Sequence, residues 1–430
     1  MSVKSQPSDR SAAPPSSRVR LLRCPECDLL YQAQPVPVGT RARCERCGAI
    51  LYANKRNAVE RSLALYLAAF VFWIVANTFN FLTFELQGNR QPTRLITGTL
   101  MLYDDGLWEL ALVVFLFVIA FPLLKVLANL SVLVPISRGR RPRHAAALLR
   151  LVDMLHPWAM TEVFLLGVLV SYAKMADLAT IEVGTALVAF VALIVTLIAG
   201  DTSLEPLELW EQVQRSPLVP APGPAEQAQL VGCHLCQFVC RLPRLSSGET
   251  ARCPRCDSVV HRRRPNALER CTALLVAAMI LYLPANIYPV MTVIMFGRGE
   301  PSTILGGVKE LLTGGSWPLA LLVFFASITV PVLKMVGLVY LLASVRRRSR
   351  ARLRERTGLY RIVEAVGRWS MVDIFVLSIL VAMVRLGSLA TIAPGLGALS
   401  FAAVVVLTMF AAMSFDPRLI WDAAGANHGR

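Results

Sequence analysis

Long apolar stretches alternate with short polar segments along this chain, and the apolar stretches have the length of bilayer-spanning helices. Residues 62–84 carry no charge over 23 positions, which at about 1.5 Å per residue is enough to cross a membrane. Residues 85–106 contain Gly88, Pro92 and Gly106, and this composition predicts an extramembrane loop. The pattern predicts eight spans in all: 62–84, 108–136, 151–172, 184–200, 271–296, 317–345, 366–384 and 393–415.

Two pairs of CxxC knuckles interrupt this pattern, one pair before each group of four spans. In each pair, sixteen residues separate the knuckles, which is the spacing of a four-thiolate zinc ribbon. The expected ligands are Cys24, Cys27, Cys44 and Cys47 in the first ribbon, and Cys233, Cys236, Cys253 and Cys256 in the second. Four thiolates leave no open position for water, so we expect two structural zinc ions and no catalysis, with a redox role or iron as the alternative.

Two cysteines stand outside the knuckles. Cys271 opens an apolar stretch and is expected to be a small buried hydrophobe. Cys240 is expected to be a bystander, or else a fifth thiol near the second ribbon.

The second half of the chain repeats the first. Matching positions include Asn77 and Asn286, Trp108 and Trp317, Pro122 and Pro331, Lys125 and Lys334, Glu162 and Asp373, and Trp210 and Trp421. We therefore predict an all-α polytopic membrane protein made of two tandem four-helix blocks, each preceded by a ribbon. The predicted domains are a disordered tail (1–20), ribbon 1 (21–54), block 1 (55–211), a Pro-rich linker (212–228), ribbon 2 (229–262), block 2 (263–422) and a tail (423–430). An acidic stretch that begins at Asp201 leads into the linker.

Composition and charge agree with a membrane protein. The 430 residues are 55% hydrophobic with a mean hydropathy of +0.55, which is too apolar for an ordinary soluble protein. The net charge of +16 could suggest a nucleic-acid partner, but the arginines cluster in alternate loops between the spans. This arrangement favours the positive-inside rule, with both ribbons, both termini and the loops 138–150 and 346–361 in the cytoplasm and no nucleic acid expected.

Ionisable residues inside the predicted spans are the main candidates for function. Lys125 and Glu162 lie in adjacent spans, and Lys334 and Asp373 repeat them, so all four could meet near one depth. Such charges either form structural ion pairs, with the lysines reaching toward the interface, or line a polar path or proton relay. If His156 and Arg368 instead mark the membrane surface, the two acids lie only about 8 Å deep.

Other polar residues and prolines mark these spans. Pro122 and Pro331 each precede a lysine by three residues and are expected to bend the helix there. Asn77 and Asn286 are expected to bond between helices or to line the path. Lys174, Asp177 and Arg385 fall in short turns at the outer face, either as solvated turn residues or as rim contacts for a headgroup or a partner. No phosphate-binding loop, catalytic triad or HExxH motif occurs, so an enzyme is not expected.

The repeated ribbons, the four-plus-four spans and the sequence Pro284-Ala-Asn286-Ile-Tyr-Pro289 give the chain a family resemblance. It resembles the paraquat-inducible protein A family over nearly all of residues 21–422. Block 1 departs from the pattern, because Val75-Ala-Asn77-Thr-Phe-Asn80 lacks both prolines, so the two blocks are expected to differ in role.

The resemblance implies an inner-membrane protein of Gram-negative bacteria with tetraspanin-like blocks. It implies work with a periplasmic MCE-domain tunnel protein in phospholipid transport and envelope integrity. Lys125, Lys334, Lys174 and Arg385 then become candidate contacts for lipid phosphate, and Glu162 and Asp373 candidate proton carriers. Two other functions stay open: a non-transporting scaffold or sensor, and a proton-coupled exporter of small toxic molecules.

Overall fold

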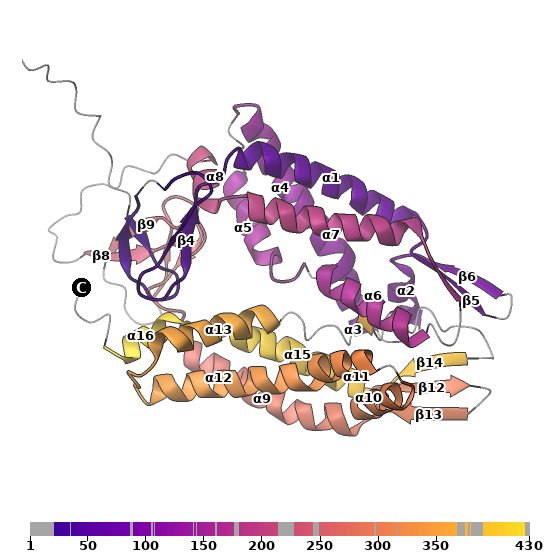
Figure 1. The fold of residues 1–430 in the computed structure, drawn as a ribbon. Helices are drawn as coiled ribbons and strands as arrows, with labels where there is room; N and C mark the ends of the chain where they lie inside the picture. Colours follow the sequence, from indigo (N-terminus) through magenta and orange to yellow (C-terminus); the bar gives the residue numbers. More distant parts are fainter. Residues whose placement is uncertain are drawn as a thin grey trace, which may run out of the picture.

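Two helical blocks lie side by side, with the two ribbons at one end and two small sheets at the other (Figure 1). We call these the ribbon end and the sheet end. The computed structural model describes residues 21–425 except 35, 87–88, 105, 107, 141, 143, 160, 176–179, 214–227, 244–248, 296–297, 316, 368–374, 377–378 and 380–389.

Each ribbon consists of two antiparallel two-stranded sheets, with one CxxC knuckle in the turn of each. Ribbon 1 contains β1 (Leu21–Arg23), β2 (Leu30–Gln32), β3 (Arg41–Arg43) and β4 (Ile50–Ala53). Ribbon 2 contains β8 (Ala228–Gly232), β9 (Val239–Pro243), β10 (Ala251–Arg252) and β11 (Val259–Val260).

The two blocks repeat the same order of elements. Block 1 contains α1 (Ala58–Thr78), β5 (Leu82–Leu86), β6 (Asn89–Thr93), α2 (Thr97–Asp104), α3 (Trp108–Val114), η1 (Phe115–Ala120), α4 (Phe121–Ser137), α5 (Ala145–Leu155), α6 (Thr161–Met175), β7 (Thr180–Val183), α7 (Thr185–Ser203) and α8 (Pro206–Val213). Block 2 contains α9 (Ala267–Ile287), β12 (Met291–Met295), β13 (Arg298–Ser302), α10 (Ile304–Thr313), α11 (Trp317–Phe324), η3 (Phe325–Thr329), α12 (Val330–Arg346), α13 (Leu353–Gly367), β14 (Ala390–Pro394), α15 (Leu396–Ser414) and α16 (Arg418–Ala423).

Six helices in the described part of the chain are long and apolar enough to cross a membrane. They are Ala58–Thr78, Trp108–Ser137, Thr185–Ser203, Ala267–Ile287, Ala320–Arg346 and Leu396–Ser414, with Thr161–Tyr172 as a shorter apolar helix. The predicted third span of block 2 falls largely outside the described residues. Four helices in each block therefore remain a prediction.

The predicted third span of block 1 is wrong at its start. A single helix was expected over 151–172, but α5 ends at Leu155 and α6 begins at Thr161. Pro157 separates them, because proline has no N–H with which to continue the helical hydrogen bonds. The segments expected as arginine-rich loops, 138–150 and 346–361, are also partly helical, since α5 and α13 fill much of them.

The helices that contain Pro122 and Pro331 each widen into a π-helical turn just before that proline. The N–H of Phe121 bonds the carbonyl of Leu116, and the N–H of Val330 bonds that of Phe325. Pro122 and Pro331 lack the N–H that would continue the α pattern, so the wider turn precedes them. The two π turns, η1 and η3, thus follow from the same residue at equivalent positions.

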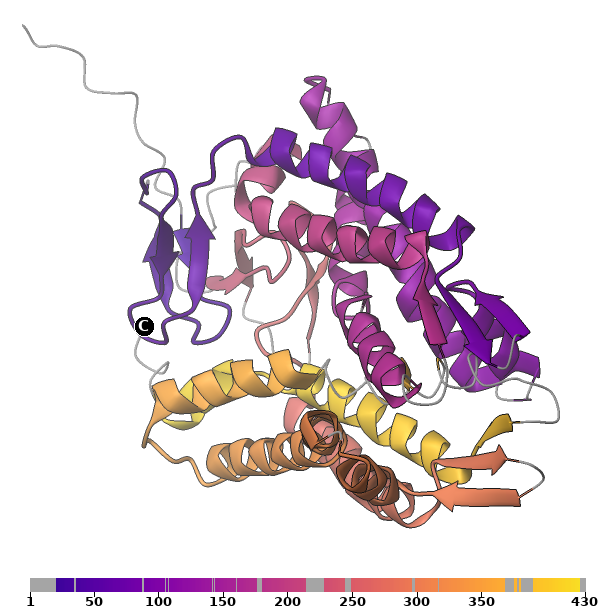
Figure 2. The same cartoon turned by 45° about the vertical axis from the view of Figure 1, so that its right-hand side comes forward.

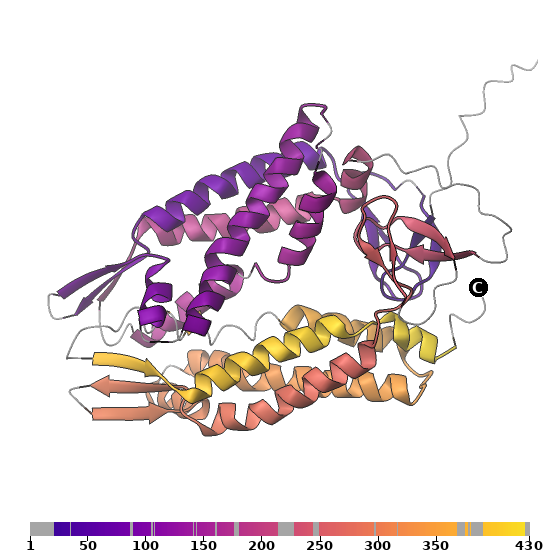
Figure 3. The ribbon, with the colours of Figure 1, turned by 180° about the vertical axis from the view of Figure 1, so that it is seen from behind.

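The prediction of an all-α chain is wrong at the sheet end. The chain is mostly helical, but each block also contains a small sheet. Strands β6-β5-β7 form one antiparallel sheet and β13-β12-β14 form its counterpart (Figure 2). Most of these segments were expected to be loops and turns, but β12 lies within the predicted fifth span, 271–296, which is therefore wrong at its end because α9 stops at Ile287. Strand β5 alternates apolar and polar residues, as Leu82-Thr-Phe-Glu-Leu86. Gly88 and Pro92 follow closely and are typical of loops, so the sequence favours a loop here. Figure 3 shows both sheets beyond the ends of the long helices.

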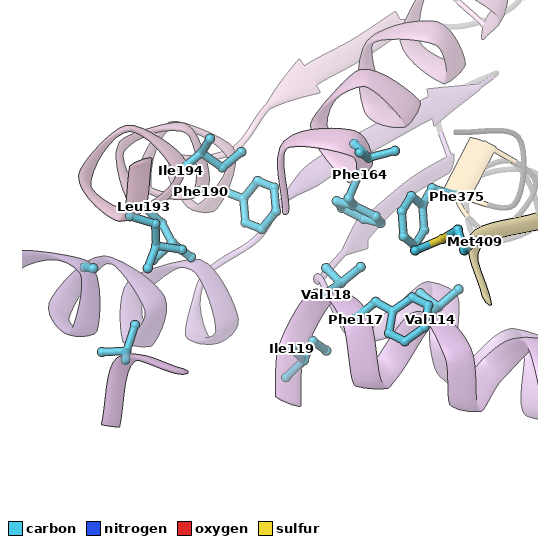
Figure 4. Packing of buried hydrophobic residues seen from close by; sticks show 14 of the residues in the cluster. Val114, Phe117, Val118, Ile119, Phe164, Phe190, Leu193, Ile194, Phe375 and Met409 are labelled. Atoms are coloured by element: carbon cyan, nitrogen blue, oxygen red, sulfur yellow. The ribbon is translucent and has the colours of Figure 1, made fainter. Parts of the chain in front are cut away.

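The two blocks meet through aromatic side chains of α6 and block 2. The rings of Phe164 and Phe375 lie 5.6 Å apart in an edge-to-face arrangement, with Met409 close by (Figure 4). Gly167 lies against Phe375, where a Cβ on Gly167 would come within 3.0 Å of that side chain. This contact joins the blocks into one hydrophobic core over part of their length.

Candidate metal centres and polar clusters

The eight knuckle cysteines come together as two buried groups of four. In each group all four sulfur atoms lie within 4.8 Å of one another. Individual Sγ–Sγ distances are 3.5 Å for Cys24–Cys47 and for Cys233–Cys256. Tetrahedral coordination with metal–sulfur bonds of about 2.3 Å would place the sulfurs about 3.8 Å apart, so both groups fit a thiophilic metal ion.

The backbone of each knuckle closes into a tight turn that contains both cysteines. The residue after the second cysteine has a positive φ in all four knuckles: Asp28, Gly48, Gln237 and Asp257. This left-handed residue closes the turn, as in the bonds from the N–H of Gly48 to the carbonyl of Cys44 and from the N–H of Asp257 to that of Cys253. Hydrogen bonds from the neighbouring thiols lower the pKa of Cys47 to about 2, which favours a thiolate there.

The two ribbons differ at one position beside the metal ligands. In ribbon 1, the Tyr31 hydroxyl donates a hydrogen bond to the sulfur of Cys44 at 3.1 Å. In ribbon 2 the equivalent residue is Cys240, whose sulfur lies 3.9 Å from that of Cys253. Cys240 is therefore a fifth thiol next to the second site. Cys271, in contrast, is buried at the start of α9 in the core.

Lys125 belongs to a polar cluster in block 1 whose acid is Asp201. The Lys125 ammonium lies 2.5 Å from the Asp201 carboxylate and 3.2 Å from the His156 ring nitrogen Nδ1. The Tyr66 hydroxyl donates to the other carboxylate oxygen of Asp201, also at 2.5 Å. The Lys125 side chain is 5% exposed and that of Asp201 26% exposed. The charge of this buried lysine is thus balanced by the Asp201 carboxylate, which Tyr66 of α1 also binds.

This cluster corrects the expectation for Asp201. Asp201 was placed in an acidic stretch leading to the linker, but it lies in the last turn of α7. Tyr66 lies two residues before the midpoint of α1, and Lys125 lies twelve residues, or about 18 Å, before the end of α4. Both are therefore close to the middle of their spans, although Asp201 lies at the end of α7. The sequence signal was present: Asp201 follows an apolar stretch long enough to hold it in the same helix.

Lys334 occupies the equivalent position in block 2 in different surroundings. It is 2% exposed, and among the described residues its ammonium has the Thr408 hydroxyl as hydrogen-bond partner, at 3.1 Å. The Ser327 hydroxyl in η3 is also fully buried and has no partner among the described residues. Asp201 and Tyr66 correspond to Ala412 and Leu275 here, so the partners of Lys125 have no counterparts at those positions.

The other predicted residues are more scattered. Glu162 lies in the first turn of α6, where a carboxylate is favoured by the helix dipole. Asn77 and Asn286 were expected to bond between helices, but each donates to the carbonyl four residues earlier in its own helix, which its short amide reaches easily. Lys174 lies near the end of α6, whereas Asp177, Asp373 and Arg385 lie outside the described residues.

Comparison with known proteins covers both halves of the chain. The sequence profile of the paraquat-inducible protein A family matches residues 59–214 and 268–425, so it matches the repeat twice. The chain belongs to this family. The resemblance that the motifs suggested is thereby confirmed.

Members of the family are similar to this chain over nearly its whole length. The intermembrane transport protein PqiA of Escherichia coli is 36% identical over 93% of this chain and 95% of its own. The lipophilic envelope-spanning tunnel protein A of Escherichia coli is 30% identical over 95% and 92%, and a probable intermembrane transport protein of Haemophilus influenzae is 27% identical over 96% and 98%. No solved structure matches the chain. Together with the six apolar helices, these relatives indicate a multi-pass membrane protein.

Proposed function

We propose that this family member is the inner-membrane component of an MCE-type phospholipid transport system. It would pass lipid between the inner membrane and a periplasmic tunnel protein and so support envelope integrity. The observation that carries the proposal is the similarity, over 93% and 96% of the chain, to relatives named as intermembrane transport proteins. We also propose that the chain is a transporter and not an enzyme.

The distribution of arginine supports an orientation with the ribbons and both termini in the cytoplasm. The arginine-rich segments 138–150 and 346–354, together with Arg262, Arg263 and Arg264, all lie at the ribbon end. Positive charge is retained on the cytoplasmic side of inner-membrane proteins. The two sheets at the sheet end would then face the periplasm and the partner.

Two structural zinc ions are the metal we propose for the ribbons. Four buried thiols at tetrahedral distances suit zinc, and all four positions of each site are filled by the protein. When bound, the metal would supply folding free energy to the knuckles and no chemistry.

Ribbon 2 is expected to tolerate the loss of one ligand better than ribbon 1. In Cys253→Ser, Cys240 can take the vacated coordination position, so zinc should stay near two per chain, whereas Cys44→Ser should leave about one because Tyr31 offers no thiolate. Zinc content of the purified chain, measured by mass spectrometry, checks this. Cys240→Ser alone should keep two zinc ions, and equal loss in Cys253→Ser and Cys44→Ser would contradict the expectation.

The polar path, in our proposal, runs through block 2. Lys334, Thr408 and Ser327 are buried polar groups within an apolar helical block. In the part of the chain that the structure describes, the Lys334 ammonium is held by one hydroxyl, and it can exchange that bond for a phosphate or a proton carrier. Lys125 is already bound to Asp201, so its role is more structural. Lys174 and Arg385 remain proposed phosphate contacts, and Glu162 and Asp373 proposed proton carriers.

Affinity purification from native membranes tests the function as a whole. The preparation is analysed for protein partners, bound phospholipid and zinc together. An MCE-domain protein with phospholipid is the expected result. Zinc without either would favour a scaffold or sensor that recruits cytoplasmic partners through its ribbons, and an MCE-free preparation that moves small cations in vesicles under a proton gradient would favour an exporter.

A further inference from the structure

Each ribbon is packed against the block that it does not precede. The cysteines of ribbon 1 belong to the same buried cluster as Tyr360 and Trp421 of block 2. The cysteines of ribbon 2 belong to the cluster that joins the two blocks, and Arg150 of block 1 bonds directly to Cys256. The two halves of the chain therefore exchange their ribbons.

Ribbon 1 is held by an arginine of α13. The Arg361 guanidinium binds both carboxylate oxygens of Glu26 and donates to the Cys47 carbonyl at 2.8 Å. Glu26 lies between Cys24 and Cys27, so both knuckles of ribbon 1 contribute an acceptor. Burial raises the pKa of Glu26, although its ion pair with Arg361 lowers it in part.

Further contacts join ribbon 1 to the end of block 2. The Arg46 guanidinium stacks 4.4 Å from the centre of the Trp421 ring. Arg263, directly after ribbon 2, donates at 2.9 Å to both Asp28 of ribbon 1 and Asp422 of α16.

Ribbon 2 is held in the same way by an arginine of α5. Arg150 donates to the carbonyls of Cys256 and Asp257 at 3.2 and 2.9 Å. Arg150 and Arg361 are equivalent in the repeat, each eight residues before a tryptophan, and Cys47 and Cys256 are each the last metal ligand of their ribbon. One contact thus occurs twice, related by the repeat and crossed between the halves.

The chain returns from each ribbon to its own block through a second joint. Lys55 donates to the Leu204 carbonyl at 3.1 Å and lies 3.7 Å from Glu205. In block 2, the backbone N–H of Arg264 donates to Asp416, the equivalent of Glu205, at 3.1 Å. Each ribbon is therefore attached to both blocks, by its knuckles to the opposite one and by the residues directly after it to its own.

We propose that each ribbon is a metal-dependent latch for the opposite block. The acceptors that Arg361 and Arg150 use are positioned by knuckle turns, and those turns fold around the metal. Loss of metal from ribbon 1 then releases α13, and loss from ribbon 2 releases α5. The two latches fix the distance between the blocks at the ribbon end, independently of what the blocks transport.

Hydrogen exchange on the full chain in detergent micelles tests this crossed coupling. In Cys24→Ser/Cys27→Ser, exchange in α13 should rise by about tenfold while α5 changes less, and in Cys233→Ser/Cys236→Ser the larger rise should be in α5. The two ribbons also touch each other, at Arg23 and Gly232, so loss of one metal can disturb both. The quantity compared is therefore the ratio of the increase in exchange in α13 to that in α5 within one sample. A larger rise in the ribbon's own block, or equal rises in both helices, overturns the proposal.

A second pair of variants keeps the metal sites intact. Arg361→Ala should raise exchange in ribbon 1, and Arg150→Ala in ribbon 2, by about tenfold with zinc content unchanged at about two per chain. Arg140→Ala removes an exposed arginine at the same end and serves as control. Unchanged exchange in both ribbons would mean that the arginine contacts do not hold them. This readout is independent of lipid, so it can fail while the proposed transport function stands, or the reverse.

Discussion

Lys125→Met should lower the free energy of unfolding of the chain by about 3 kcal/mol. The substitution leaves the Asp201 carboxylate next to the Tyr66 hydroxyl without its cation, and breaking one side of a buried ion pair costs about 3–5 kcal/mol. The lower end of this range applies because the Asp201 side chain is 26% exposed, so water partly stabilises its unpaired charge. Denaturant unfolding of the purified protein in detergent, followed by tryptophan fluorescence, measures the change.

A double variant shows whether the single variant loses stability through the unpaired charge or through the lost packing of the lysine. Lys125→Met/Asp201→Asn removes both charges, and the carbonyl of the introduced amide can still accept the hydrogen bond from Tyr66, so stability should return to within about 1 kcal/mol of the original. A double variant no more stable than Lys125→Met would show that the lysine contributes through its packing. An unchanged single variant would show that the ion pair contributes nothing.

Lys334→Met should leave stability intact and reduce lipid transfer, although Lys334 is equivalent to Lys125 in the repeat. Among the described residues its partner is the neutral Thr408 hydroxyl, so no carboxylate of that set loses its cation. Burying an ammonium costs free energy, and methionine has a similar volume, so stability should be unchanged or higher. Phospholipid transfer should fall by about tenfold or more if this ammonium serves the path, since tenfold is only about 1.4 kcal/mol.

Transfer is measured from proteoliposomes that hold the chain together with its co-purified partner. Lys309→Met, which removes an exposed lysine of α10, is the control and should transfer normally. Normal transfer by Lys334→Met would remove Lys334 from the path. A loss of stability as large as in Lys125→Met would instead indicate that an acid outside the described residues, such as Asp373, pairs with it.

The candidate sites differ in how far the sequence could predict them. The eight knuckle cysteines could be assigned as metal ligands from the sequence. The two ligands of each knuckle are close in sequence, and the geometry of the knuckle fixes their spacing. The partner of Lys125 could not, since Lys125 and Asp201 lie on different helices and their contact depends on packing and tilt. The break between α5 and α6 had a local cause in Pro157, but the apolar residues around it masked that signal.

The repeat itself was readable, because matching residues recur in the same order, but equivalence of sequence did not imply equivalence of environment. Lys125 and Lys334 align, yet one is neutralised by Asp201 and the other meets Thr408. Their surroundings come from residues that the repeat does not preserve, such as Tyr66 against Leu275. A repeat predicts shared backbone more reliably than shared chemistry.

The sequence by itself determined the long apolar helices, the four-thiolate sites and the family, because hydropathy, knuckle spacing and motif order act over short stretches of chain. Only the tertiary structure decided which block each ribbon contacts. Arg361 and Cys47 lie on opposite halves of the chain. The hydropathy and cysteine patterns would be the same whether a ribbon docked on the block that follows it or on the opposite one. The crossed arrangement depends on the shape and charge of surfaces that form only after both blocks have folded, which no local pattern encodes.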